Sequence, residues 1–227
     1  MSTIITGFIL GFILPFVVGR FGKILPATPG VIIANMYHRP HFPKVPNPIQ
    51  TGRLKRKWLE LFQAAFGWGI VMAILFHIIT IAMPEHVHIF AFLFVWVILA
   101  SILVDSAIQL LPDFFTLPLT LMGFWFAAQT KTIDISYSLA GSFFGYLISI
   151  VSVLVTRSSE KTEFGAGDVK LLVALGGWLG VIGLNYAIIL SFLLFVLLSA
   201  VRGKKVGAYG PAVGLGALFT FFVIYTK

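Results

Sequence analysis

Ile89-Phe-Ala-Phe-Leu-Phe-Val-Trp-Val-Ile-Leu-Ala-Ser-Ile-Leu-Val104 is an unbroken apolar run that leads directly into Asp105. Such a run approaches the length a helix needs to cross the hydrocarbon core of a bilayer. A second acid, Asp168, follows Phe164-Gly-Ala-Gly and precedes another apolar stretch. Carboxylates in or beside hydrocarbon are costly and usually mark function. The sequence therefore predicts a membrane protein with two functional aspartates.

The composition of the whole chain favours the same class. Of the 227 residues, 59% are hydrophobic and only 11% are charged, which is more apolar surface than a soluble domain needs. We predict an all-α polytopic membrane protein with about eight transmembrane helices. The expected spans are residues 3–19, 59–83, 88–108, 114–129, 135–156, 169–181, 184–201 and 209–226.

The basic residues predict the orientation of these spans. With eight spans, all 16 Lys and Arg residues except Lys131 and Lys227 fall on one side of the membrane. That side is predicted to be cytoplasmic, which places both termini on the opposite, outer side of the membrane. The formal charge of +8 then reflects topology and contact with anionic lipids, and nucleic-acid binding is not expected.

Three parts of the chain are expected on this topology. Residues 1–19 form a first transmembrane helix, which is retained because it lacks the features of a cleaved signal peptide. Residues 20–58 form a basic, proline-rich cytoplasmic loop without any acid. Residues 59–227 form a membrane-embedded bundle that contains both aspartates.

Asp105 and Asp168 both map to the cytoplasmic ends of their spans, so they are able to meet. Two neighbouring carboxylates do not both ionise easily, and a pair that shares one proton can activate water for attack on a peptide bond. Such a pair titrates as a unit. The alternative is that each aspartate is a helix cap that faces water.

Several neighbouring residues are expected to support this site. Gly165 and Gly167 allow close approach of the backbone and a turn into the helix that begins near Asp168. We expect Asp113, after the helix-breaking Pro112, to cap the next helix. Two further charged residues are expected at the cytoplasmic ends of spans. Glu60 is expected to form an ion pair with a cytoplasmic Lys or Arg. Lys170 either snorkels to the interface, holds a substrate carbonyl or tunes Asp168.

The sequence offers no metal site. It contains no cysteine, which excludes disulfides and cysteine-ligated zinc or iron. The five histidines form no ligand set with the acids: His86 and His88 fall on the opposite side of the membrane from the aspartates, and His38 and His41 lie in the basic loop. No phosphate-binding loop and no Ser/His/Asp arrangement is evident.

Four stretches together resemble the type IV prepilin peptidases, or leader peptidases, of the GxGD aspartyl protease group. They are Trp58-Leu-Glu-Leu-Phe-Gln-Ala-Ala-Phe66, Val104-Asp-Ser-Ala-Ile-Gln-Leu-Leu-Pro-Asp-Phe-Phe-Thr-Leu-Pro-Leu119, Phe164-Gly-Ala-Gly-Asp-Val-Lys-Leu-Leu-Val-Ala-Leu-Gly-Gly-Trp-Leu-Gly180 and Tyr209-Gly-Pro-Ala-Val-Gly-Leu-Gly216. The resemblance covers most of residues 58–227. It implies that Asp105 and Asp168 are a catalytic pair.

The resemblance also implies a reaction and its partners. The enzyme would remove the short basic leader of type IV prepilins or pseudopilins, typically after a glycine, at the cytoplasmic face of the membrane, with no cofactor. Many family members carry two CxxC pairs in the cytoplasmic loop and methylate the new N-terminus with S-adenosylmethionine. The cysteine-free loop departs from this pattern, so zinc is not expected and methylation stays an open question. The sequence does not define an oligomeric state.

Three alternatives stay open at this point. Another GxGD intramembrane protease, of the preflagellin or presenilin-like kind, would use the same pair. A proton-coupled transporter would use Asp105 and Asp168 as proton carriers, although the paired repeats frequent in carriers are not visible. A catalytically inactive assembly scaffold is disfavoured because both aspartates and both glycines of the motif are present.

Overall fold

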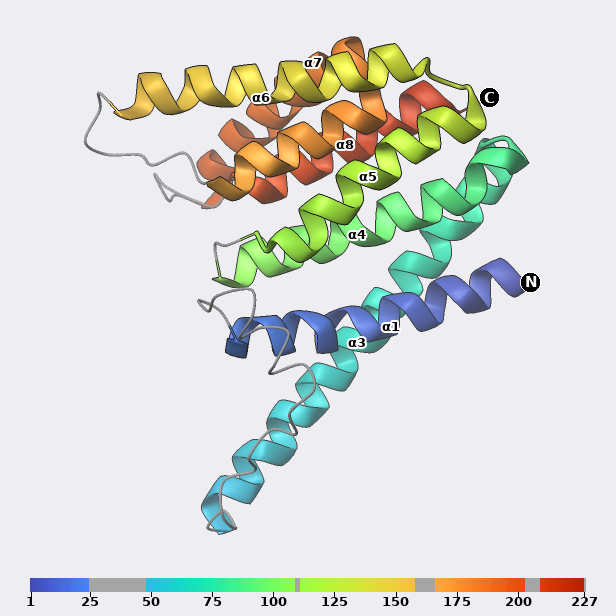
Figure 1. The fold of residues 1–227 in the computed structure, drawn as a ribbon. Coiled ribbons are helices and arrows are strands. Elements are labelled where there is room, and N and C mark those ends of the chain that lie inside the picture. Colours follow the sequence, from blue (N-terminus) through green and yellow to red (C-terminus); the bar gives the residue numbers. More distant parts are fainter. Residues whose placement is uncertain (25–47, 109–110, 158–165, 203–208, 227) are drawn as a thin grey trace. The chain divides into compact units, whose positions relative to one another are not determined.

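A computed structural model describes residues 1–24, 48–108, 111–157, 166–202 and 209–226. Regular structure within these ranges is helical throughout (Figure 1). The elements are α1 (Ser2–Ile24), α3 (Pro48–Ala82), the short 3-10 helix η1 (Glu85–Val87), α4 (His88–Ile108), α5 (Asp113–Thr130), α6 (Ile135–Arg157), α7 (Ala166–Arg202) and α8 (Gly210–Tyr225). The predicted all-α class is confirmed.

Five of the helices that the structure describes are long and apolar enough to cross a membrane. Their apolar parts are Ser2–Gly19, Glu60–Ala82, Glu85–Ser106, Ile135–Ser152 and Gly167–Leu197. The chain is therefore a polytopic membrane protein. By this measure the structure has fewer spans than the eight predicted. Helix α5 is not among the five candidate spans, and α8 is shorter than they are. The spans expected at 169–181 and 184–201 are parts of one helical run.

The predicted cytoplasmic loop at 20–58 differs from the structure at both of its ends. Helix α1 continues to Ile24, and α3 begins at Pro48, so both ends of the predicted loop are helical. The basic start of α3 leads into the apolar part at Glu60, which agrees with the span predicted at 59–83. Residues 25–47, the remainder of the predicted loop, lie outside the described residues.

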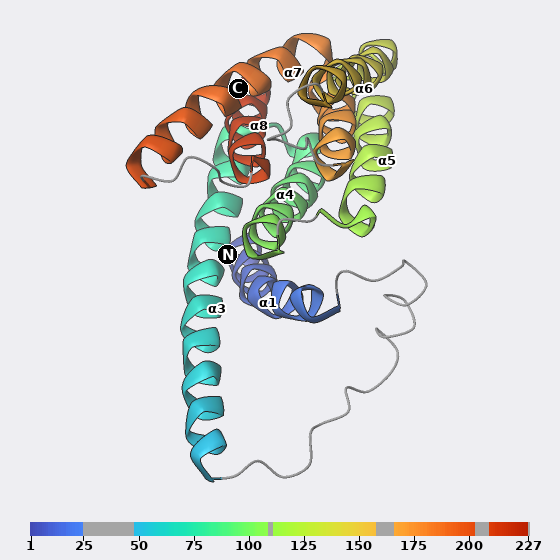
Figure 2. The ribbon, with the colours of Figure 1, turned by 90° about the vertical axis from the view of Figure 1, so that its left-hand side faces the viewer.

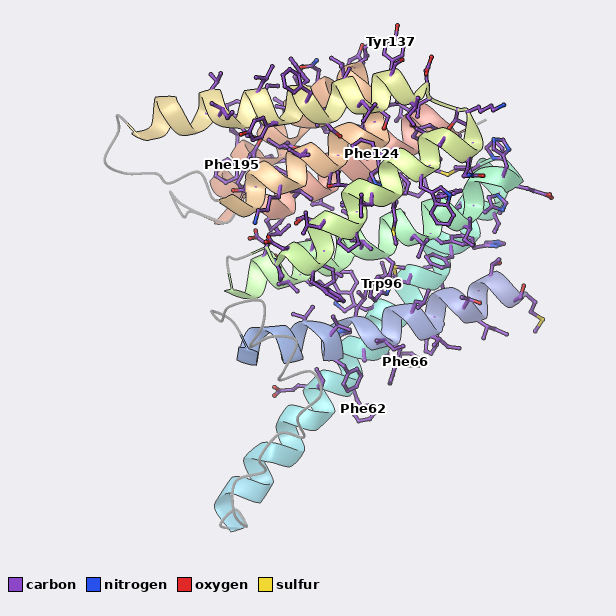
Figure 3. The ribbon with its side chains drawn as sticks, in the orientation of Figure 1. Phe62, Phe66, Trp96, Phe124, Tyr137 and Phe195 are labelled. Carbon is purple, nitrogen blue, oxygen red and sulfur yellow. The ribbon has the colours of Figure 1, made fainter. Side chains whose placement is uncertain are left out.

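The chain divides into two compact units, Met1–Ile78 and Ile79–Lys227. In the first unit, α1 packs on α3 through small residues and aromatic rings. A Cβ on Gly11 would overlap the carbonyl of Trp68, so the two helices approach at backbone distance. Beside this contact the rings of Phe8 and Phe66 lie 5.5 Å apart, and those of Phe12 and Phe62 lie 6.0 Å apart. Figure 3 labels Phe62 and Phe66 on α3.

In the second unit, α7 packs against α5, α6 and α8 (Figure 1). The contact with α6 is the closest, because small residues face each other there. Added Cβ atoms on Gly141 or Gly176 would overlap the backbone of the opposite helix. Small residues at this spacing are the usual means by which helices approach closely in lipid. Ser142 adds a 2.9 Å hydrogen bond from its hydroxyl to the carbonyl of Val173.

Helix α7 changes direction at Gly180, which has φ 65° and ψ −175° (Figure 2). This conformation is essentially restricted to glycine. A break in a helix leaves carbonyls without their usual N–H partners, which is costly in lipid. Two hydroxyl groups supply the missing donors: Ser138 binds the carbonyl of Gly177 at 2.5 Å, and Tyr225 binds that of Trp178 at 2.7 Å. The spans predicted at 169–181 and 184–201 thus adjoin near a kink at Gly180 within one helical run, and their separation into two crossings stays a prediction.

An aromatic core around Trp178 joins the helices of the second unit. Trp178 is fully buried, and its indole N–H donates a 2.7 Å hydrogen bond to the carbonyl of Leu119. The ring of Phe94 lies 4.8 Å from the indole, and that of Phe126 lies 5.1 Å away. Phe94 also stacks on Phe221 at 4.4 Å. The position of α7 relative to α4, α5 and α8 is thereby fixed near the kink.

Replacing Gly180 with alanine should destabilise the protein, because alanine rarely adopts this conformation and its Cβ would approach Ile133 to 2.8 Å. The expected loss is about 1–3 kcal/mol, seen as a lower apparent Tm in detergent. Gly67→Ala is the matched control, since a Cβ there meets nothing within 4 Å and alanine favours the helix. Equal Tm values for the two variants would contradict the strained conformation assigned to Gly180.

Candidate functional site

Asp105 lies in the last turn of α4 and is only 6% exposed. Its carboxylate lies directly against the backbone of Gly210, because a Cβ added there would overlap Oδ2. Four residues further along α8, Gly214 makes the same kind of close approach to Ile102. This pair of glycines lets α8 come near enough to α4 to enclose the carboxylate.

The environment of Asp105 lacks the groups that normally stabilise a buried carboxylate. Its Oδ2 atom is buried and has no hydrogen-bond partner among the described residues. A charge in such a place is unfavourable unless it is paired. A buried, unsatisfied carboxylate in a native structure therefore requires a functional explanation, such as a proton held on the group or a ligand that is bound during reaction.

Asp168 lies in the first turn of α7, where the helix dipole favours a negative charge. Its charge acts on Asp105, so the structure brings the two predicted aspartates within electrostatic range of each other. The preceding Gly167 packs against Leu111, and a Cβ there would come within 2.8 Å of the leucine Cβ. Gly165, the other glycine of the motif, lies outside the described residues.

Asp113 and Lys170 form an ion pair that joins the starts of α5 and α7. The Lys170 Nζ donates to Asp113 Oδ1 at 2.5 Å, and both side chains are partly exposed, at 42% and 44%. The predicted capping role of Asp113 is wrong in detail, because Pro112 occupies the N-cap position and the carboxylate binds the lysine instead. The sequence did not predict Asp113 as the partner of Lys170, since spacing in sequence does not reveal a contact 57 residues away.

Glu60 is exposed near the start of the apolar part of α3. It belongs to the first unit, whereas both aspartates belong to the second. Its supporting role at the site stays a prediction.

Two residues at the start of α8 belong to the site although the sequence did not single them out as site residues. The backbone of Gly210 lies against the Asp105 carboxylate, and Tyr209 is the N-cap residue of α8. The negative charge of Asp168 lies within electrostatic range of the Tyr209 hydroxyl. The Tyr-Gly-Pro sequence after a basic segment could have indicated the start of α8, because proline at N1 or N2 marks a helix start.

A groove of about 340 Å³ begins beside the site. Its walls come from α5, α6 and α7 and are almost entirely apolar. The lining residues are Thr116, Leu117, Thr120, Tyr146, Val169, Lys170 and Val173. Because Val169 and Lys170 directly follow Asp168, a chain lying in this groove would pass close to the carboxylate.

The described residues contain no group of three or more acids and histidines that could hold a metal ion. The absence of cysteine from the whole sequence removes the ligands of a zinc module. The chemistry that the site offers is that of two interacting carboxylates, one buried without a partner and one at a helix start. Such an arrangement suits general acid–base catalysis on a polar bond.

Comparison with known proteins agrees with this chemistry. Residues 91–200, which include both aspartates, match the model of the type IV leader peptidase family. No solved structure gives a significant match to the chain. The family resemblance inferred from the sequence motifs is confirmed.

Three relatives illustrate the similarity, and each is named prepilin leader peptidase/N-methyltransferase. The protein of Dichelobacter nodosus is 32% identical over 137 residues, which are 58% of this chain and 48% of the relative. That of Neisseria gonorrhoeae is 34% identical over 125 residues, 52% of this chain and 43% of the relative. That of Escherichia coli K12 is 32% identical over 140 residues, which are 56% of this chain and 60% of the relative. The chain thus spans about half the length of the curated relatives it matches.

The contact between Asp105 and Gly210 can be tested by a double-mutant cycle that needs no activity. Gly210→Ala should lower stability by about 1–3 kcal/mol, because the added methyl group collides with the carboxylate. In an Asp105→Ala background, the same substitution should cost clearly less. The readout is the apparent Tm of the four proteins in one detergent. Equal costs of Gly210→Ala in the two backgrounds would show that the two residues are not in contact.

Proposed function

We propose that this chain, whose residues 91–200 belong to the type IV leader peptidase family, is an intramembrane aspartic endopeptidase. Its substrates are type IV prepilins or pseudopilins, from which it removes the short basic leader peptide. The observation that supports this most directly is the buried, unpartnered carboxylate of Asp105 within electrostatic range of Asp168. The names of the relatives supply the substrate class.

The two carboxylates take different parts in the reaction. Asp105, buried against Gly210, carries the shared proton, because a charge there has no partner among the described groups. Asp168, at the start of α7, is ionised and acts as the general base. This division follows the pattern of aspartic proteases, in which one carboxyl activates water and the other polarises the scissile carbonyl.

Each proton in the reaction has an assigned position. Asp168 takes a proton from water while the water oxygen bonds to the scissile carbonyl carbon, and Asp105 gives its proton to the carbonyl oxygen. The resulting gem-diol then collapses as the C–N bond breaks. Asp168 passes its proton to the departing amine, and Asp105 recovers one from a diol hydroxyl. Both carboxyls return to their starting states, so no cofactor is needed.

The remaining site residues support this pair. Gly167 gives the backbone a close approach to Leu111 in front of Asp168, and the Asp113–Lys170 ion pair holds the starts of α5 and α7 together. Because that pair is partly exposed, its contribution to stability is small, and its role is to position α7.

We further propose eight membrane crossings in the bacterial inner membrane, with both termini in the periplasm. The site then opens to the cytoplasm, at the ends of the spans flanked by basic residues. Residues 20–58 lie on that side and contact lipid headgroups. The substrate's own apolar helix stays in the bilayer while its basic leader reaches Asp105 and Asp168 from the cytoplasm.

The proposal is confined to proteolysis. The relatives' printed names include N-methyltransferase, but the cysteine module expected for the larger members is absent from this sequence. Methylation with S-adenosylmethionine is therefore a separate question, which the cleavage product answers when its new N-terminus is weighed by mass spectrometry.

The test is cleavage of a purified prepilin by the protein in liposomes without any ion gradient. Wild type should release the leader, whereas Asp105→Asn and Asp168→Asn should each lower kcat by about 10²–10⁴-fold or more, the usual contribution of an acid or base. Asp134→Asn is the matched control: this aspartate is exposed at the start of α6, where it binds the backbone N–H of Ser136.

Two results would overturn the proposal. Cleavage at the wild-type rate by either variant of the pair would remove that residue from the mechanism. Failure of the wild type to cleave any of several prepilins, combined with proton-dependent flux in liposomes, would assign the aspartates to a transporter.

A further inference from the structure

The starts of α5 and α7 form a charged end of the groove described above. Lys170 lines this groove, and its amine binds the carboxylate of Asp113 at the start of α5. Asp168 lies two residues before Lys170, in the first turn of α7. Two carboxylates and one ammonium group are therefore gathered at this end, which leaves it with a net negative charge.

The rest of the groove is apolar. It follows α5 and α7, which pack against each other (Figure 2). On α5, the lining residues Leu117 and Thr120 lie about one and two turns beyond Asp113. On α7, Val173 lies about one turn beyond Lys170. Because one end is charged and the other is apolar, the groove suits a chain that changes from polar to apolar along its length.

Asp113 is able to bind a second cation. Lys170 contacts its Oδ1 atom, whereas an ionised carboxylate accepts hydrogen bonds at both of its oxygens. The Asp113 side chain is 44% exposed, so a cationic group that arrives from water can reach it. A bond of this kind leaves the pair with Lys170 in place, so it does not require α7 to move.

The charge at this end of the groove is opposite in sign to that of the whole chain. The sequence carries a formal charge of +8, and most of its basic residues are expected on the side of the membrane that holds both aspartates. A cationic peptide is repelled by such a surface and attracted to carboxylates within it. Repulsion elsewhere combined with attraction at one place is a common source of specificity.

We infer that Asp113 binds a lysine or arginine of the substrate shortly before the scissile bond, while the apolar residues that follow the bond lie in the groove. This order brings the bond itself close to Asp168. It agrees with a basic leader joined to an apolar helix, and the inference rests on the proposed peptidase function. Asp113 is then a specificity-determining residue, whose contribution lies in binding the substrate and not in the chemical step.

Two variants that break the same ion pair separate this role from a structural one. Asp113→Asn removes the negative charge, so KM for a prepilin with a basic leader should rise about two- to tenfold, as for loss of a partly exposed ion pair. Lys170→Gln keeps the carboxylate and removes its internal cation, so KM for the same prepilin should fall. Asp134→Asn removes an exposed acid at the start of α6 and should leave KM unchanged.

The substrate supplies the second half of the test. In a matched prepilin, the last basic residue of the leader is replaced with glutamine. Wild type and Asp113→Asn should then have the same KM, because the charge that Asp113 binds is gone. Added salt should raise the KM of wild type for the basic leader more than for the neutral leader, since salt screens exposed charges.

The outcomes separate this inference from the proposed function. If wild type cleaves, and Asp113→Asn either leaves KM unchanged or raises it equally for both leaders, Asp113 does not bind the leader while the peptidase stands. Equal increases in KM for Asp113→Asn and Lys170→Gln also overturn the inference, because only the ion pair would then matter. If wild type itself cleaves no prepilin, the peptidase proposal fails first, and leader binding by Asp113 fails with it.

Discussion

The structure depends on one contact, in which the Asp105 carboxylate lies against the bare backbone of Gly210. A buried carboxylate is costly in any low-dielectric medium, and the chain surrounds this one with close-packed helices. Glycines at 210 and 214 bring α8 onto α4. Asp105 and Asp168 come from distant parts of the sequence, so their electrostatic interaction requires the packing of separate helices.

The position of Asp168 depends in turn on α7. The part of this helix before the kink at Gly180 is held at both of its ends. At its start, Lys170 binds Asp113 of α5. At its end, the kink at Gly180 follows Trp178 in the aromatic core, and hydroxyls from Ser138 and Tyr225 satisfy the carbonyls that the kink leaves free. The position of the Asp168 carboxylate thus depends on the ion pair at the start of α7 and on the packing around its kink.

Sequence reasoning reached the membrane-protein class and the resemblance to the leader peptidase family, because apolar runs and a carboxylate after Gly-Ala-Gly are local signals. The catalytic roles of Asp105 and Asp168 stay a prediction. The expected spans 169–181 and 184–201 adjoin close to the kink at Gly180. Sequence reasoning missed the ion pair of Lys170 with Asp113 and the contact of Gly210 with Asp105, because both depend on which helices pack together. The cap predicted at Asp113 was wrong because Pro112 already occupies the N-cap position. The eight-span topology stays a prediction, since charge bias orients spans but does not show which helices cross.

The central claim, that Asp105 and Asp168 form one site, is tested most directly by cross-linking, since the natural chain contains no cysteine. Asp105→Cys/Asp168→Cys in membranes is treated with a short bismaleimide, and the intramolecular bridge is detected by intact-protein mass. The control is Asp105→Cys/Asp134→Cys, because Asp134 lies where α6 begins, at the end of the bundle away from the end of α4 (Figure 1). The account predicts a bridge in the first protein and none in the control. Two thiols that each react singly but form no bridge, or that bridge equally in both proteins, would contradict it.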